Sequence, residues 1–126
     1  MRRLFLFSIV SILLFPLLGS AQREKLPPRD LIQVEKKWPL AVRTSTGLYT
    51  QVLREGTGAY PERGDMVEVL YKGSLLDGTV FDTAEDRADP FKFQLDRGRV
   101  IAGWEYGMLA MREGEIRLLI VPYELG

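Results

Sequence analysis

The feature that most constrains the fold is a series of short segments in which apolar and polar residues alternate. In a β-strand, this alternation places apolar side chains on one face and polar side chains on the other. The alternating segments are residues 48–54, 66–72, 91–96 and 116–121, and a further strand begins at Val80-Phe81, after the turn dipeptide Asp77-Gly78. The chain from Thr44 onward is therefore predicted to consist mainly of β-strands.

One segment departs from this pattern. Ile101, Trp104, Met108 and Met111 are spaced by three, four and three residues, which places them on one face of a helix. Gly114 is expected to end this short helix in a left-handed conformation. Several strands with turns between them and a single helix predict an α+β domain, in which one antiparallel sheet lies against the helix.

Composition excludes several classes of function. The 126 residues suit one globular domain, and 17 basic residues balance 17 acidic ones, so no excess of positive charge is available for nucleic acid. Without cysteine or histidine there is no disulfide, thiol nucleophile, imidazole base or His/Cys zinc site. No histidine can activate Ser45 or Ser74, which disfavours a serine hydrolase. A carboxylate-based hydrolase remains open, although nothing places two carboxylates around one cleft.

The N-terminal segment has the pattern of a secretory signal. Arg2 and Arg3 precede an apolar run over residues 4–18, and Gly19-Ser20-Ala21 supplies the small residues that a signal peptidase accepts. As a helix, the run would rise only about 22 Å, which is short of a hydrocarbon core about 30 Å thick. We expect residues 1–21 to be cleaved, without a lipid anchor, and the protein to be periplasmic or secreted with no membrane contact after cleavage.

Residues 22–43 are charged and contain three prolines, so we expect a linker or loosely docked arm before the domain of residues 44–126. Leu31, Val34 and Trp38 have the spacing of one or two turns of amphipathic helix. A flexible spacer explains the composition as well, and the sequence leaves both alternatives open.

Aromatic and branched residues gather at the ends of the predicted strands and helix. They are Tyr71, Phe81, Phe91, Val100, Ile101 and Trp104, with Asp82 and Arg87 among them. Taken singly, each apolar residue is an ordinary core residue, Asp82 a turn cap and Arg87 a solvated charge. A functional reading therefore depends on their combination.

This combination resembles the FKBP family of peptidyl-prolyl cis-trans isomerases. The resemblance rests on residues 69–82, 90–93 and 100–105, and extends from about Gly47 to Gly126. It implies a sheet curved around one short helix, and a proline pocket whose walls and floor are the six apolar residues named above, with Asp82 and Arg87 at its rim. It further implies proline-containing polypeptide substrates, macrolide inhibitors as ligands, no cofactor and no metal. The backbone N–H of Ile101 would bind a substrate carbonyl.

The resemblance also implies a missing part. Related sequences continue beyond the last residues of this chain with a tyrosine, a proline-containing loop and a closing β-strand. We therefore expect an FKBP-like sheet that lacks its C-terminal strand, exposes unpaired backbone groups, and folds and acts poorly. The alternatives to an isomerase are a noncatalytic module or chaperone that binds proline-containing segments, and an inactive fragment.

Overall fold

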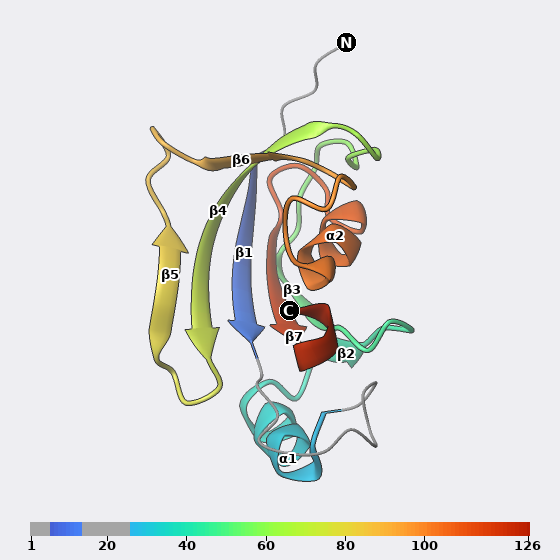
Figure 1. Ribbon diagram of the computed structural model, residues 1–126, viewed down its shortest axis with the longest axis vertical. Coiled ribbons are helices and arrows are strands. Elements are labelled where there is room, and N and C mark those ends of the chain that lie inside the picture. The colour runs from blue at the N-terminus through green and yellow to red at the C-terminus, as the bar shows by residue number, and fades with distance from the viewer. Residues whose placement is uncertain (1–5, 14–25) are drawn as a thin grey trace.

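The computed structural model describes residues 6–13 and 26–126. Its main feature is a seven-stranded sheet with the order β2-β3-β7-β1-β4-β5, in which β6 also pairs with β4 (Figure 1). The strands are β1 (Leu6–Leu13), β2 (Val42–Arg43), β3 (Tyr49–Arg54), β4 (Met66–Leu75), β5 (Val80–Ala84), β6 (Phe91–Gln94) and β7 (Ile116–Val121). Each segment predicted from alternation is a strand, and the α+β, FKBP-like fold is confirmed.

The predicted helix is α2 (Ala102–Leu109), which lies against one face of the sheet (Figure 1). Two glycines allow it to lie close to β7. A Cβ added at Gly103 would be 2.7 Å from Cγ1 of Val121, and one added at Gly107 would be 2.8 Å from Cδ1 of Leu119. The helix side chains Trp104 and Met108 are thereby buried in the main core cluster with Leu119 and Val121.

The opposite face of β7 is also buried. Leu118 and Ile120 form a second cluster with Leu26 and Val34, the latter from helix α1 (Pro28–Lys37). Pro28 in the first turn, Asp30 near the N-terminus and lysines in the last turn suit the start and end of this helix. Of the two alternatives for this segment, the structure therefore has the amphipathic helix, and it is docked on the sheet.

Strand β1 makes the sheet mixed rather than purely antiparallel. It pairs in parallel with β4 on one side, from Leu6 opposite Glu68 to Leu13 opposite Leu75, and in parallel with β7 on the other. Of its side chains, that of Ile9 is 1% exposed and belongs to the main core. Between β4 and β7 the backbone groups are paired, because residues 6–13 supply a strand there (Figure 1).

The predicted signal peptide therefore lies partly within the described residues and partly outside them. Residues 6–13 form β1, whereas residues 1–5 and 14–21, including the expected cleavage position, lie outside the described residues. In the described part of the chain, no helix combines the length and apolar character needed to cross a membrane.

Gly78 was predicted to lie in a tight turn and Gly114 to end the helix, and only the first prediction is confirmed. Gly78 has a φ of +94° in the tight turn between β4 and β5, where its N–H donates to the carbonyl of Leu75. Gly114 also has a positive φ, of +85°, but it does not cap the helix. The helix ends at Leu109, and Gly114 lies in a separate turn closed by the N–H of Glu115 and the carbonyl of Arg112 at 3.0 Å.

Candidate functional site

A cavity of about 210 Å³ lies where β4, β5, β6 and the start of α2 meet. It is lined by Tyr71, Gly73, Phe81, Asp82, Phe91, Val100, Ile101 and Trp104. The structure thus brings together all of the predicted site residues except Arg87. The lining is almost entirely apolar, because only Tyr71 and Asp82 among these residues carry a polar side chain outside the indole of Trp104.

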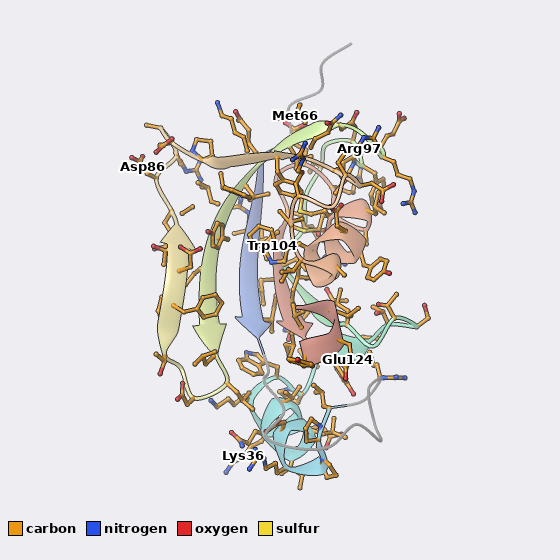
Figure 2. All side chains as sticks on the ribbon, viewed as in Figure 1. Lys36, Met66, Asp86, Arg97, Trp104 and Glu124 are labelled. Carbon is orange, nitrogen blue, oxygen red and sulfur yellow. The ribbon has the colours of Figure 1, made fainter. Side chains whose placement is uncertain are left out.

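Trp104 is the most deeply buried aromatic residue of the lining and is 7% exposed. Its ring centroid lies 4.8 Å from that of Tyr71 and 6.2 Å from that of Phe91, at interplanar angles of 76° and 72°. These edge-to-face contacts are favoured by aromatic quadrupoles. Figure 2 shows Trp104 between α2 and the sheet, and its side chain is part of the pocket lining.

Phe81 and Asp82 are consecutive residues of β5, yet both line the pocket. Neighbouring residues of a regular strand point to opposite faces. Here the pairing with β4 is irregular, because Gly73 lies opposite Asp82 and Ser74 lies opposite Val80, which leaves Phe81 as the extra residue of a bulge. A bulge of this kind redirects side chains locally, so the irregular pairing accounts for both residues facing one cavity.

Gly73 is the lining residue that sequence reasoning missed. It is buried within β4, and a Cβ added there would lie 2.8 Å from Cζ of Phe81. Glycine inside a strand is often a sign that another group approaches the backbone closely. That signal is present in the sequence, but it does not reveal which group approaches.

The polar part of the pocket is a hydrogen bond between two strands. The Tyr71 hydroxyl on β4 donates to Oδ2 of Asp82 on β5 at 2.5 Å. Burial, followed by this hydrogen bond and the charge of Asp82, raises the pKa of the Tyr71 phenol from its ordinary value of 10.0 to about 12. The phenol is therefore a protonated donor at neutral pH, and Asp82 accepts this bond rather than capping a turn.

Another part of the lining comes from the loop that leads into α2. Val100 and Ile101 line the pocket there, and Ile101 is the N-cap residue of the helix. The Ile101 carbonyl accepts hydrogen bonds from the N–H groups of Trp104 and Glu105, at 3.0 and 3.2 Å. The N–H of an N-cap residue has no partner within the helix itself.

Arg87 is not among the residues that line the cavity. It is exposed in the turn after β5, where Oδ1 of Asp86 accepts from the N–H of Ala88 at 2.9 Å. Asp86 lies in the same turn as Arg87, and Figure 2 shows it at the edge of the molecule, far from Trp104. This placement corrects the expectation that Arg87 would border the pocket together with Asp82.

Two further observations concern the polar side chains of the described residues. The indole Nε1 of Trp104 is buried and has no hydrogen-bond partner within residues 6–13 and 26–126. Over the same residues, no group of three acidic side chains is arranged to hold a metal ion. The lining and the hydrogen bond of Tyr71 make the site a small aromatic cavity with one fixed hydroxyl, suited to an apolar ring with an adjoining polar group.

A curved sheet against a short helix, with an aromatic cavity at the helix start, defines a recognisable class of domain. The sequence matches the family of FKBP-type peptidyl-prolyl cis-trans isomerases over residues 58–126, more than half of the chain. The chain belongs to this family.

Its relatives include peptidyl-prolyl cis-trans isomerase FKBP15-2 of Arabidopsis thaliana, which is 50% identical over 64 residues, covering 51% of this chain and 39% of that protein. Peptidyl-prolyl cis-trans isomerase FKBP2 of Homo sapiens is 48% identical over 64 residues, covering 51% of this chain and 45% of that protein. The crystal structure of FkpA from Escherichia coli has a TM-score of 0.68 at 38% identity, covering 78% of this chain and 46% of that one. The chain spans less than half the length of these three proteins.

Proposed function

We propose that the protein catalyses cis-trans isomerisation of X-Pro bonds in polypeptides. The observation that carries this proposal is the cavity of about 210 Å³ whose lining includes the buried indole of Trp104. A proline ring is a compact apolar group, and edge-to-face aromatic walls provide a dry surface for it. Family membership supports the same activity.

The chemistry requires no covalent step. Rotation about the X-Pro bond has a barrier of about 18 to 20 kcal/mol, because amide resonance is lost in the twisted state. Removing water from the amide oxygen disfavours the charge-separated resonance form and so weakens the double-bond character of the C–N bond. Residues that bind the twisted amide better than the planar amide then lower the barrier.

In this proposal the apolar residues have distinct roles. Trp104 is the floor beneath the proline ring, while Tyr71, Phe81, Phe91, Val100 and Ile101 enclose it. The Ile101 N–H donates to a neighbouring substrate carbonyl, since the helix does not use that group. Asp82 acts on the rim by holding the hydroxyl of Tyr71, which keeps the Tyr71 ring against Trp104.

The alternative function is a noncatalytic module or chaperone that docks proline-containing segments. Trp104→Leu distinguishes the two, because it removes the floor and is expected to lower kcat/KM for a proline peptide by about a hundredfold, the scale on which misplaced geometry acts. Trp38→Leu is the matched control, since Trp38 packs with the second cluster on the opposite face of the sheet. The chaperone would be favoured if the unaltered protein does not isomerise proline peptides and the Trp104→Leu variant still suppresses aggregation.

Macrolide inhibitors are proposed as ligands of the same pocket. A macrolide that binds there should compete with a proline peptide and quench the fluorescence of Trp104, but should leave the emission of Trp38 unchanged. Fluorescence of the Trp38→Leu variant isolates the signal of Trp104. Saturable quenching without inhibition of isomerisation would place the ligand elsewhere.

Export is proposed from the sequence of residues 1–21, namely the paired arginines, the apolar run and the small residues before Gln22. In the structure, residues 6–13 form β1, so cleavage after Ala21 would remove a strand that pairs on both sides. N-terminal sequencing of the protein recovered outside the cytoplasm tests this proposal. A first residue of Gln22 supports cleavage, and a chain that stays in the cytoplasm with Met1 or Arg2 first overturns export.

A further inference from the structure

We propose that Glu105 is a positioning residue that fixes the loop of residues 96–101 and thereby the pocket wall formed by Val100 and Ile101. The proposal rests on the proposed isomerase function, because it concerns the same pocket. Glu105 follows Trp104 in the first turn of α2 but does not itself line the cavity. Any effect it has on the reaction must therefore pass through other residues.

Glu105 is bonded to both ends of this loop. Its Oε2 accepts a hydrogen bond from the N–H of Asp96 at 2.5 Å, and its own N–H donates to the carbonyl of Ile101 at 3.2 Å. The side chain thus holds the first residue of the loop, while the backbone holds the last. Glu105 therefore restrains both ends of the loop of residues 96–101.

The loop needs such a restraint because it has no strand partner. The last backbone hydrogen bonds before the loop are at Leu95, whose N–H donates to the carbonyl of Asp65 and whose carbonyl accepts from the N–H of Gly64, both at 2.8 Å. Asp96 then adopts a φ of +60°, the one positive φ of a non-glycine residue in the described chain. This left-handed conformation is unfavourable for most residues, so a contact that holds the Asp96 N–H in place stabilises it.

A second contact at Asp96 is weaker. Its Oδ2 lies 2.8 Å from Nη1 of Arg63, but the side chain of Arg63 is 65% exposed. Ion pairs between exposed groups contribute little to stability because water and salt screen them. The hydrogen bond to Glu105 is half-buried by comparison, and it is charge-assisted.

The burial of Oε1 of Glu105 raises the cost of breaking the hydrogen bond between Oε2 of Glu105 and the N–H of Asp96. Oε1 is buried and has no hydrogen-bond partner within the described residues. Because Oε1 has no hydrogen-bond partner among the described residues, the carboxylate depends on the N–H of Asp96 as a donor to Oε2. A buried charge without a partner is costly. The loop and the carboxylate therefore restrain each other, and the loop wall is held against the floor residue that directly precedes Glu105.

The test compares Glu105→Ala with Glu105→Gln. Glutamine keeps an acceptor for the Asp96 N–H, so kcat/KM is expected to stay within about threefold of the unaltered protein. Alanine removes it, and kcat/KM is expected to fall by about tenfold, since small displacements of a binding geometry have effects of this size. Val34→Ala in the second cluster is the control for general destabilisation, because Val34 lies on the face of the sheet opposite the pocket helix.

Amide hydrogen exchange gives a readout independent of activity. Exchange at Asp96 should accelerate by at least about tenfold in Glu105→Ala, remain slow in Glu105→Gln, and be unchanged in Val34→Ala. Equal losses of activity in Glu105→Ala and Val34→Ala, or unaltered exchange at Asp96, would overturn the positioning role. If the unaltered protein does not isomerise proline peptides, the proposed function fails, and the exchange comparison alone decides whether Glu105 holds the loop.

Discussion

The backbone of Gly73 lies against the ring of Phe81, so that a Cβ added to Gly73 would be only 2.8 Å from Cζ and 3.1 Å from Cε2 of that ring. The contact joins β4 to the bulge of β5 at the side of the pocket. Glycine is required there for space, since the residue has no positive φ. The shape of this wall therefore depends on the absence of one methyl group.

Gly73→Ala is expected to push the Phe81 ring away from the cavity. Phe81 is 48% exposed and can move, so the free energy of unfolding should change by no more than about 1 kcal/mol, the low end of overpacking costs. Catalytic efficiency should fall by about tenfold because the wall is displaced. Ser74→Ala at the next position is the control. Full isomerase activity in Gly73→Ala would show that Phe81 does not shape the substrate site.

The pH dependence of Tyr71 follows from its surroundings. Folding raises the pKa of the phenol from 10.0 to about 12 through burial, the hydrogen bond to Asp82 and its charge. The protonated form is favoured in the folded state, so this contribution to stability is complete below pH 10 and is lost as pH rises to about 12. Tyrosinate absorbance in alkaline titration, compared with that of Tyr71→Phe, should assign the latest-titrating phenol to Tyr71.

Asp82→Ala provides the control for that assignment. It removes the hydrogen bond and the charge of Asp82 but leaves the burial of Tyr71, so the pKa of Tyr71 should fall back toward 10.0. Isomerase activity should fall by about threefold to tenfold, because the Tyr71 ring loses its anchor. An unchanged titration of Tyr71 in this variant would contradict the origin given for the shift.

Ile9 links the N-terminal strand to the core and to the pocket. Its side chain is 1% exposed, and its Cα lies in register with that of Tyr71. In the chain that keeps residues 1–21, Ile9→Ala should lower the free energy of unfolding by about 2 to 5 kcal/mol, and Ile9→Val by about 0.5 to 1.5 kcal/mol. Ile32→Ala in α1 is the matched control, because Ile32 is 64% exposed. Equal stability of Ile9→Ala and Ile32→Ala in denaturant titration would mean that β1 is not part of the core.

Gly107→Ala should have two opposing effects on stability, one through helix propensity and one through packing. Alanine is favoured over glycine in a helix by about 1 kcal/mol. The new Cβ would lie 2.8 Å from Cδ1 and 2.9 Å from Cδ2 of Leu119, and overpacking of this kind costs about 1 to 3 kcal/mol. The packing effect should dominate, so we expect a lower midpoint of thermal unfolding. A higher midpoint would show that Leu119 moves aside at little cost.

Local patterns predicted most of the fold. Alternation over residues 66–72 and 116–121 predicted β4 and β7, because the pleat of a strand sends successive side chains to opposite faces. The spacing of Trp104 and Met108 predicted α2 in the same way, from the period of a helix. The resemblance of the aromatic residues to a known family predicted most of the residues that line the cavity, with Arg87 as the exception.

Local patterns along the chain are therefore enough to predict which segments form strands and helices and which residue types could build an apolar pocket, since these depend on backbone periodicity and side-chain chemistry. Three other features are seen only in the folded protein: residues 6–13 lie in parallel between β4 and β7, Phe81 forms a bulge against Gly73, and Glu105 reaches Asp96. The physical reason is that a strand edge or a buried carboxylate accepts any suitable partner. Which partner it meets depends on how distant segments pack together.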